Sequence, residues 1–412
     1  MKLLVVSSWF PYPPDNGSKL RAYHLLTALA RRHAVTLLSF AEPGEERRTP
    51  ELKALCETVC TVRSNPYKPL GRLSHRHLFS STPRSYAQNH SLAMQALVDR
   101  EAPAHGAAVA LQIGAALYLA RHDRMPRVLE EIEAGSMRDQ YCGQPISVAR
   151  ARHGLTWWKF ARFVRQLVGA FDRTTVVSDL ERQHLADIGC DMTRVRVVPN
   201  GVERSDLLRP NRPVAGRLVY PGSITYSANL DAVQHFLSET FPRIQAARPD
   251  VSFRVTGAIG DVDVRRLSAD PAVTFTGRLD DVKTLITQCA VCVVPLRKGG
   301  GTRLKILESM ALGTPVVSTT KGAEGLSVVP ERDVLLADSP DAFAAQVLRI
   351  LNNPLLRARL SASGRNLVGQ SYTWDHVGSQ LDALIEEARL KDAGRLAIDV
   401  GGQGAASETT GA

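Results

Sequence analysis

The chain of 412 residues is poor in cysteine and has no long apolar run. Its six cysteines are scattered, unlike the paired framework of a small secreted protein. Cys289 and Cys292 have the CxxC spacing of some metal and redox sites, but no second pair follows, so we expect buried free thiols. No apolar run reaches the roughly 18 residues that a membrane-spanning helix needs, so no transmembrane helix is expected.

The N-terminal segment also lacks the long apolar core of a signal peptide. It is better interpreted as a first strand, and a cytoplasmic protein is expected. The turn after this strand has no GxGxxG, which argues against a nicotinamide dinucleotide. The net charge of +10 points to anionic partners, namely phosphorylated substrates, anionic lipid or nucleic acid. Neither zinc-finger spacing nor an aromatic RNA-binding motif is present, so nucleic acid is not expected as a partner.

Short apolar runs alternate with segments of helical periodicity, which predicts an α/β fold with parallel sheets. The turn Pro199-Asn200-Gly201 separates two such series, and the length fits two domains. We predict a first domain over 1–203, a second over 204–370, a last helix over 371–391 and a disordered tail over 392–412. The strands expected in the first domain are Leu3–Ser7, Val35–Phe40, Ala107–Ile113, Arg127–Ile132, Thr174–Ser178 and Val195–Val198.

One stretch, Val291–Ser318, combines a buried strand, a glycine loop, a helix and a second strand. The loop contains Gly299, Gly300 and Gly301, which allow a ligand to approach the backbone closely. The basic residues Lys298, Arg303 and Lys305 crowd the start of the helix, where the helix dipole is already positive. A bound anion would reverse this unfavourable arrangement, so the pattern predicts a phosphate site.

The same helix places a carboxylate about one turn further on. Lys305 and Glu308 are three residues apart and should point together on the side opposite the apolar face. Glu308 could then accept hydrogen bonds from two sugar hydroxyls, such as those of a ribose. An ordinary solvated Lys–Glu pair is the alternative interpretation.

Two further segments of the first domain carry polar groups near expected strand ends. Glu131 and Glu133 belong to an acidic stretch at the end of a strand, where α/β proteins place their chemistry, although a solvated acidic loop is equally compatible. Asn16, Gly17 and Ser18 begin the first helix and could hold a phosphate or an acceptor hydroxyl, or form an ordinary helix cap.

The segment from Arg150 to Arg173 is rich in both aromatic and basic residues. If helical, it resembles a segment that lies on an anionic membrane surface. In the alternative interpretation its aromatic side chains pack onto the domain core and its basic groups are solvated. The stretch Arg150–Arg165 would hold the protein at the membrane surface in the first case.

Several motifs together resemble the retaining glycosyltransferases of the GT-B class known as family 4. They are VVPNGV at 197–202, TGR at 276–278 and GTRLKILESMALGTPVVSTTKGAEGL from residue 301. The resemblance covers almost the whole chain in order. It implies two Rossmann-like domains that face a central cleft, with the donor on the C-terminal domain, the acceptor on the N-terminal domain and a last helix crossing back.

Site residues follow from the resemblance by position. Glu308 matches the second glutamate of the E-x7-E motif, which grips the donor ribose, and Gly301 lies at the helix start that faces the diphosphate. Arg278 falls where the family contacts the nucleobase. The donor site implied in this way consists of Gly222, Ser223, Arg278, Lys298, Gly300, Gly301, Thr302, Arg303 and Glu308.

The sequence departs from the family pattern at three points. Gly300 replaces the first glutamate of E-x7-E, and the usual basic pair is missing after the first strand of the second domain, where Gly222 and Ser223 stand. We expect Arg303 and Lys305 to take over neutralisation of the leaving diphosphate. The N-domain histidine is also missing, and Glu131 or Glu133 is expected to orient the acceptor hydroxyl instead.

The resemblance implies a retaining glycosyltransferase of the hexosyltransferase type, acting in polysaccharide or glycoconjugate biosynthesis. The resemblance also implies that no protein-bound metal is needed. No cofactor is expected, and a nucleotide-diphosphate sugar is the donor substrate. The acceptor is expected to be a saccharide, lipid-linked if the protein works at the cytoplasmic face of a membrane. Two alternatives share the fold: a nucleotide-sugar 2-epimerase, and a non-catalytic nucleotide-sugar-binding protein, which the lack of a carboxylate at Gly300 favours.

Overall fold

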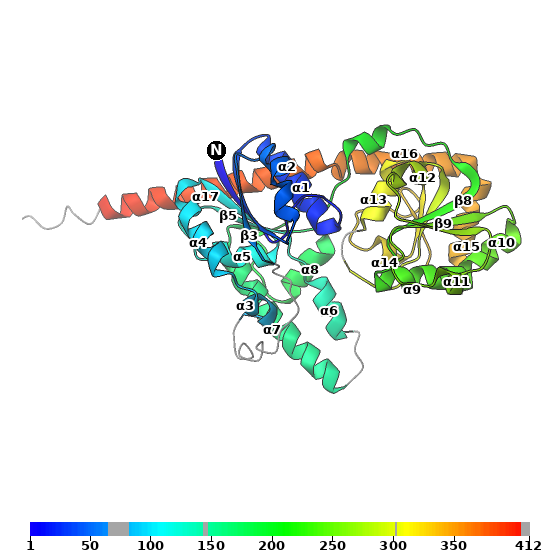
Figure 1. Cartoon of the computed structure of the whole chain (residues 1–412), viewed down its shortest axis with the longest axis horizontal. Coiled ribbons are helices and arrows are strands. Elements are labelled where there is room, and N and C mark those ends of the chain that lie inside the picture. Colours follow the sequence, from blue (N-terminus) through cyan, green and yellow to red (C-terminus); the bar gives the residue numbers. More distant parts are fainter. Residues whose placement is uncertain (65–81, 143–146, 301–302, 405–412) are drawn as a thin grey trace, which may run out of the picture. The chain divides into compact units, whose positions relative to one another are not determined.

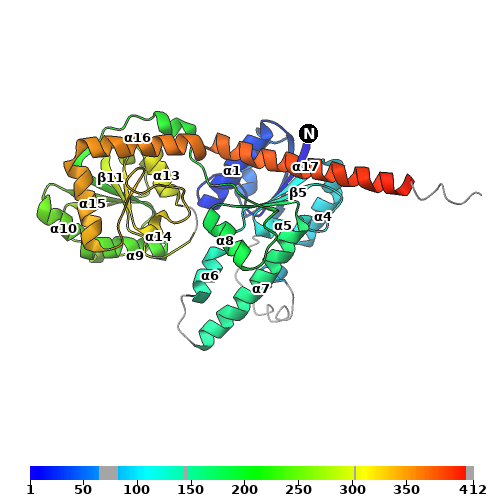
Figure 2. The ribbon, with the colours of Figure 1, turned by 180° about the vertical axis from the view of Figure 1, so that it is seen from behind.

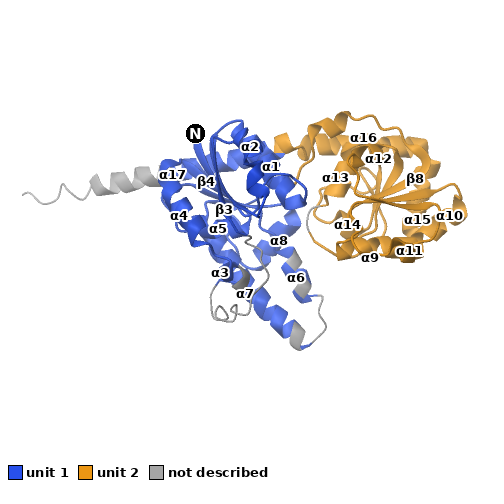
Figure 3. Cartoon of the chain, in the orientation of Figure 1, with its two compact units in different colours: residues 1–199, 377–412 blue, residues 200–376 orange. Residues whose placement is uncertain are grey.

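The computed structural model describes residues 1–64, 82–142, 147–300 and 303–404. The chain divides into two compact units (Figure 3). Unit 1 consists of residues 1–199 together with 377–412, and unit 2 consists of residues 200–376. Each unit is an α/β layer structure, with helices packed on a central sheet (Figures 1 and 2). Among the described helices, none has the length and hydropathy required to cross a membrane.

Unit 1 is built on a parallel sheet of seven strands in the order β3-β2-β1-β4-β5-β6-β7. The strands are β1 (Lys2–Ser7), β2 (Ala34–Ala41), β3 (Thr58–Arg63), β4 (Ala107–Leu111), β5 (Arg127–Glu130), β6 (Arg173–Val176) and β7 (Val195–Val197). Its α-helices are α1 (Gly17–Ala30), α2 (Thr49–Lys53), α3 (Arg84–Gln88), α4 (Leu92–Glu101), α5 (Ile113–Leu119), α6 (Gly135–Cys142), α7 (Val148–Ala170), α8 (Asp179–Asp187) and most of α17 (Trp374–Gly404). The central strands β1 and β4 are buried almost throughout, as expected for a parallel sheet covered on both faces.

Unit 2 is built on a parallel sheet of six strands in the order β10-β9-β8-β11-β12-β13. The strands are β8 (Val214–Pro221), β9 (Ser252–Thr256), β10 (Val273–Gly277), β11 (Cys289–Val294), β12 (Val316–Ser318) and β13 (Leu335–Leu336). Its α-helices are α9 (Ser227–His235), α10 (Phe241–Ala247), α11 (Val264–Leu267), α12 (Val282–Thr287), α13 (Leu304–Ala311), α14 (Thr320–Ala323), α15 (Pro340–Asn352) and α16 (Pro354–Ser371). The α/β class with two parallel, Rossmann-like sheets, predicted from the alternating pattern, is confirmed.

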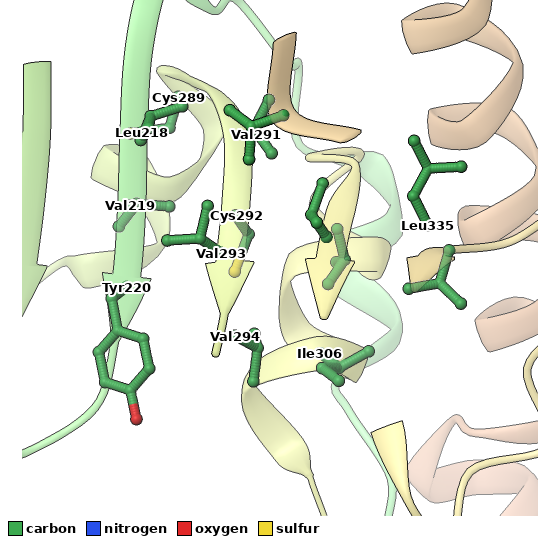
Figure 4. Packing of buried hydrophobic residues seen from close by; sticks show 14 of the residues in the cluster. Leu218, Val219, Tyr220, Cys289, Val291, Cys292, Val293, Val294, Ile306 and Leu335 are labelled. Carbon is green, nitrogen blue, oxygen red and sulfur yellow. The ribbon is translucent and has the colours of Figure 1, made fainter. Parts of the chain in front are cut away.

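The core of unit 2 lies around β8 and β11. All residues of β11 are buried, including the free thiols of Cys289 and Cys292. Figure 4 shows the side chains of β8 and β11 packed together, with the ring of Tyr220 extending past the end of β8. Fully burying each of these Val or Leu side chains stabilises the fold by about 1.5–3 kcal/mol. This packing fixes the strand ends from which the polar residues described below project.

The strands of both sheets follow the same pattern of order. The direction in which successive strands are added across the sheet reverses between β1 and β4 in unit 1 and between β8 and β11 in unit 2. In sheets of this kind, the loops after the two strands on either side of the reversal diverge and leave a crevice at the carboxyl ends of the strands. Ligands bind there in open α/β folds. The structure therefore identifies one candidate site in each unit before any side chain is considered.

Strand β3 and the end of helix α17 are among the elements at which the structure differs from the sequence-based prediction. Strand β3 was not predicted, because TVCTVR is a partly exposed edge strand with no strong apolar period. Helix α17 was predicted to end near Leu390, with a disordered tail from 392, but it continues to Gly404. The segment Lys391–Val400 contains good helix formers and no proline, so the helix can propagate past the folded core. Residues 405–412 lie outside the described part of the chain.

Candidate substrate sites

The glycine loop of unit 2 lies between β11 and α13, at the switch point of the sheet. Gly299 has a φ of 101°, a backbone conformation that favours glycine. Arg303, at the N-cap of α13, is buried, and its guanidinium donates to the carbonyls of Gly299 and Gly300, each at 2.8 Å. Its Nη2 also lies 3.2 Å from the carbonyl of Lys321. Arg303 therefore lies at the start of α13, as the sequence predicted, and its hydrogen bonds stabilise the conformation of the glycine loop.

Lys305 extends from the first turn of α13 to the end of β8. Its ammonium donates to the Tyr220 hydroxyl at 2.7 Å and to Oδ1 of Asn229 at 2.9 Å, and it lies 4.1 Å from the centre of the Tyr220 ring. These partners are neutral, so they satisfy the hydrogen bonds of the ammonium without cancelling its charge. Burial accordingly lowers the pKa of Lys305 to about 7. Among the described ion pairs none joins Lys305 to Glu308, although the charge of each affects the pKa of the other. The expectation that the two side chains point together stays a prediction.

The turn after β8 leaves space for the ammonium of Lys305. A Cβ at Gly222 would lie 2.8 Å from Nζ of Lys305 and 3.2 Å from Nδ2 of Asn229. Only a glycine therefore leaves room for the ammonium at this strand end. Ser223 follows, and its hydroxyl donates to the carbonyl of Ala258 at 2.9 Å. The turn has no basic residue of its own, and Lys305 on α13 supplies the positive charge beside it.

Glu308 faces a different set of charges. The groups that influence its ionisation include Lys283 and Asp206, which form an ion pair of 2.9 Å with each other. Burial raises the pKa of Glu308 to about 7, and the Lys283 ammonium opposes this rise. A carboxyl group of this kind can both donate and accept hydrogen bonds near neutral pH. It is suited to vicinal hydroxyls, which also do both.

The remaining residues predicted for the donor site are less enclosed. Lys298 is exposed and forms an ion pair of 3.1 Å with Asp231 on α9. Arg278 follows β10 and is exposed. Gly300 lies in the loop held by Arg303. Gly301 and Thr302 lie outside the described residues.

Unit 1 has a pocket of about 280 Å³ at its own switch point. The pocket combines aromatic rings with uncharged and acidic polar groups. It is lined by Trp9, Ser18, Tyr86, Gln112, Ile113, Gly114, Glu131, Glu133, Met137 and Phe160. Three of the predicted residues, Ser18, Glu131 and Glu133, are therefore brought together. Aromatic faces and hydroxyl-binding side chains of this kind suit a sugar.

Two lining residues of this pocket have unusual backbones. Gln112 follows β4 with a φ of 68°, and Glu131 follows β5 with a φ of 62°. Such conformations cost about 1–3 kcal/mol for residues other than glycine and are concentrated at functional sites. They direct both side chains from adjacent strand ends into one pocket. Among the described non-glycine residues, only Glu331 shares a positive φ with them.

The carboxylates at this strand end have separate roles. Glu130 is fully buried and accepts a hydrogen bond of 2.7 Å from Nε of Arg21, which is also fully buried. The Arg21 guanidinium donates in addition to the carbonyls of Val198 and Pro199, at 2.9 and 2.8 Å. Glu131 lies further out, and Oε2 of Glu131 is 4.0 Å from Nε of Arg21. Burial raises the pKa of Glu131, and the positive charge of Arg21 opposes this rise.

The start of α1 contains the other residues predicted for the acceptor side. Asn16 is the N-cap of α1 and accepts a hydrogen bond of 3.0 Å from the backbone amide of Lys19. Asn16 and Gly17 are exposed, and neither is among the lining residues of the described pocket. Ser18 is the residue of this trio that lines it. The alternative of an ordinary helix cap is correct for Asn16.

Sequence reasoning missed four residues that build these sites: Tyr220, Asn229, Gln112 and Arg21. Tyr220 and Asn229 are 85 and 76 residues away from Lys305 in sequence, so no local pattern connects them. The segment that contains Gln112 has the sequence pattern of an ordinary strand end, and the segment that contains Arg21 has the pattern of an ordinary helix. An arginine on the inward face of α1 was the one available signal, because a buried arginine requires a partner.

Comparison with protein families assigns both halves of the chain. Residues 16–206 match the family described as Glycosyltransferase Family 4, and residues 215–353 match the family described as Glycosyl transferases group 1. The first match includes every lining residue of the unit 1 pocket except Trp9, and the second includes the glycine loop and α13 of unit 2.

Two relatives are named mannosyltransferases. The chain is 28% identical over 165 residues to the GDP-mannose-dependent monoacylated alpha-(1-6)-phosphatidylinositol monomannoside mannosyltransferase of Corynebacterium glutamicum, an alignment that covers 37% of this chain and 43% of the relative. It is 26% identical to the MMP alpha-(1->4)-mannosyltransferase of Mycolicibacterium hassiacum, over 56% of this chain and 58% of the relative. The chain thus spans about half the length of these relatives.

Solved structures share the fold over almost the whole chain. The Anabaena Alr3699/HepE structure with UDP and glucose has a TM-score of 0.65 at 15% identity and covers 93% of this chain and 99% of its own. The sucrose-phosphate synthase of Thermosynechococcus elongatus has a TM-score of 0.68 at 17% identity and covers 94% of this chain and 99% of its own. The chain therefore shares the fold of these solved structures, and it matches two glycosyltransferase family models, each over less than half of its length.

Proposed function

We propose that this protein is a retaining glycosyltransferase that transfers a sugar from a nucleotide-diphosphate sugar to a saccharide acceptor. The observation that carries the proposal is the half-buried Lys305 ammonium at the switch point of unit 2, which donates to neutral oxygen partners. A half-buried cation of this kind is stabilised when an anion binds beside it. The start of α13 and the glycine loop add backbone N–H groups with the same preference.

The donor binds to unit 2 in this proposal. Its diphosphate lies at the glycine loop and the start of α13, where Lys305 supplies the positive charge. Arg303 binds the carbonyls of the loop, so that these oxygens point away from the diphosphate. The ribose hydroxyls bind to Glu308. The named relative that depends on GDP-mannose and the HepE structure that contains UDP support a nucleotide diphosphate as the ligand class.

The acceptor binds in the pocket of unit 1, with a hydroxyl held by Glu131. During transfer, the bond between the anomeric carbon and the diphosphate oxygen breaks, and the electron pair leaves with the diphosphate. The acceptor oxygen forms the new bond on the same face of the sugar, and its proton passes to the departing phosphate oxygen. Lys305 stabilises the charge that develops on the diphosphate, so no further cation is needed for that step.

A turnover assay with a panel of nucleotide-diphosphate sugars tests the proposal. We expect the donor to be consumed rapidly only when a saccharide acceptor is present, and the product to keep the anomeric configuration of the donor, as read from its proton coupling. Epimerised donor in the absence of acceptor would instead identify an epimerase. Binding of nucleotide sugars without turnover for any acceptor would identify a binding protein, the alternative that Gly300 favours.

The acceptor proposed here is a glycan or glycolipid precursor, since one relative is named for a phosphatidylinositol monomannoside. The same panel can decide this point. A lipid-linked saccharide and its water-soluble headgroup are compared as acceptors at equal concentration. A preference for the lipid-linked form is expected only in the presence of detergent micelles or vesicles.

A further inference from the structure

Helix α7 (Val148–Ala170) has two faces of different character. One face is buried in the core of unit 1 and includes Phe160, Phe163 and Val164, at 2%, 4% and 0% exposure. Sequence reasoning left open whether the aromatic residues of this segment face the core or a membrane. For the two phenylalanines the core alternative is correct. The side chains on the opposite side of the helix are exposed or half-buried.

The outer face of α7, as defined here, consists of Arg152, Leu155, Trp158, Lys159, Arg162 and Arg165. These residues lie within about 80° of Leu155 on a helical projection. Leu155 is 55% exposed and Trp158 is 57% exposed. Among the residues whose side chains the structure describes, no other helix has two large hydrophobic residues exposed to this extent. Figures 1 and 2 show α7 projecting beyond the sheet of unit 1.

The charge of α7 has a single sign. The segment 148–170 contains five Lys and Arg residues and neither Asp nor Glu. A solvated surface helix ordinarily mixes both signs, because i to i+4 ion pairs stabilise it. The outer face of α7 instead places four positive charges around an apolar pair.

We propose that the outer face of α7 binds the surface of a membrane that contains anionic lipids. A leucine and a tryptophan at this position enter the boundary between headgroups and acyl chains, and the flanking Lys and Arg side chains contact the lipid phosphates. A nucleic acid would use the charges but leave the exposed leucine without a role. A second copy of the chain would bring like charges together. The proposal is independent of the glycosyl transfer proposed above, because binding requires no turnover.

Flotation with lipid vesicles tests this proposal with the full-length protein. We expect binding to phosphatidylcholine vesicles that contain about a third phosphatidylglycerol, weak binding to pure phosphatidylcholine, and release when salt shortens the Debye length from about 10 Å to 3 Å. Each basic residue near such a surface changes the affinity about fivefold. The triple variant Arg152→Gln/Arg162→Gln/Arg165→Gln should therefore bind about 100-fold more weakly.

Matched variants separate this face from general charge. The same three charges are removed from exposed positions of unit 2 in Arg265→Gln/Arg266→Gln/Arg359→Gln. The affinity of this control variant for vesicles should fall by less than about fivefold, because these arginines do not approach the lipid. For the apolar pair, Leu155→Ala/Trp158→Ala is compared with Leu355→Ala, an exposed leucine on α16. The first should weaken vesicle binding about tenfold or more, and the second should leave it unchanged.

The blue shift of tryptophan fluorescence on vesicle binding gives a second readout, which Trp158→Phe should remove. Circular dichroism and nucleotide binding verify that each variant is folded. Equal losses in the two triple variants would overturn the proposal, as would vesicle binding that survives loss of the apolar pair and the charges. Tighter binding to an RNA oligonucleotide than to vesicles, unaffected by Leu155→Ala/Trp158→Ala, would overturn it in favour of nucleic acid. A dimer that dissociates in the α7 triple variant would overturn it in favour of self-association.

Discussion

The two units use the same strand order and place polar groups at the same point of the sheet, but the charge of those groups is opposite. At the switch point of unit 2, the half-buried ionisable group is a cation, Lys305, surrounded by neutral hydrogen-bond acceptors. At the switch point of unit 1, the pocket is lined by two carboxyl groups, Glu131 and Glu133, and by aromatic rings. The topology therefore determines where each site forms, and a few side chains determine whether it prefers an anion or a polyhydroxyl ligand.

The two units also differ in whether the innermost charge of the site is paired with an opposite charge. In unit 1, Glu130 is neutralised by Arg21, so the innermost charge is paired and the outer Glu131 is left for a ligand. In unit 2, the ammonium of Lys305 has no carboxylate at hydrogen-bonding distance among its described partners. The folded state therefore carries an electrostatic cost that a ligand can relieve. This difference predicts that ligand binding stabilises unit 2 more than unit 1.

The strongest test of the comparison removes the cation of unit 2. Lys305→Met keeps an unbranched side chain of similar length, so it should not leave a large cavity. We expect affinity for a nucleoside diphosphate to fall about 30- to 100-fold, since charge-assisted hydrogen bonds contribute about 1.5–3 kcal/mol each. Isothermal titration calorimetry measures this directly. Because the half-buried charge is gone, the unliganded variant should unfold at the same or a higher temperature than the wild type.

Lys298→Met is the matched control. It makes the same substitution in the same loop, at an exposed lysine paired with Asp231. Exposed ion pairs contribute about 0–1 kcal/mol, so nucleotide affinity should change by less than about fivefold. Similar losses in both variants would mean that the loop as a whole, and not the half-buried ammonium, provides the anion site.

The second test alters the acidic site of unit 1. Glu131→Gln should lower the rate of transfer to a saccharide acceptor about 10- to 100-fold, because the group that holds the acceptor hydroxyl loses its charge. Affinity for the nucleotide should stay within about twofold, because this group lies in the other unit. Glu133→Gln changes the more exposed carboxylate and should have an effect below about threefold. Steady-state kinetics at saturating donor separates the two steps, and a loss of nucleotide affinity in Glu131→Gln would contradict the division of roles.

The sequence predicted the positions of both sites better than their inner geometry. The glycine loop, Lys305 and Glu308 lie within one local motif, so periodicity and helix-start chemistry were sufficient to find them. The direction of each side chain was not predictable in this way. Lys305 turns toward Tyr220 and Asn229 because the strand end of β8 offers oxygen acceptors there, and that contact exists only after the sheet has formed.

In unit 1 the acidic pair Glu131 and Glu133 was recognised from its place after a strand, but no local pattern indicates the positive φ of Glu131. Backbone conformations of this kind are imposed by tertiary packing and contradict local propensity. Strand β3 was missed for a related reason, because its pairing with β2 supplies the stability that its own residues do not signal. The fold class followed from the pattern, whereas these exceptions follow from long-range contacts.

The third test concerns Glu308, whose burial favours the neutral acid up to a pKa of about 7. Glu308→Gln should weaken binding of a nucleoside diphosphate about tenfold, because the amide accepts hydrogen bonds at one atom only. The same change should stabilise the protein at pH 8. The folded pKa lies above the unfolded value, so the native carboxyl is favourable below the unfolded pKa, and its contribution is lost as pH rises through about 7.

The size of that stabilisation is about 1–3 kcal/mol at pH 8, and it should fade below pH 5. Urea denaturation at both pH values measures it. A variant that loses both stability and nucleotide affinity would show that Glu308 has a structural role and would remove the ribose contact from the proposal.

The smallest predicted effect is a pH dependence of nucleotide affinity. The pKa of Lys305 is about 7 in the unliganded protein, and a bound diphosphate raises it. Affinity should therefore be constant below pH 7 and fall as pH rises through the interval between the free and bound pKa values, by about fivefold from pH 7 to pH 8 if the bound value is near 9. Lys305→Met should remove the contribution of Lys305 to this slope and leave the titrations of the nucleotide phosphate and of Glu308, whose pKa is also about 7. Calorimetry in two buffers of different ionisation enthalpy should also show proton uptake on binding above pH 7. An unchanged slope in Lys305→Met would assign the pH dependence to another group and weaken the contrast between the cationic and the acidic switch points.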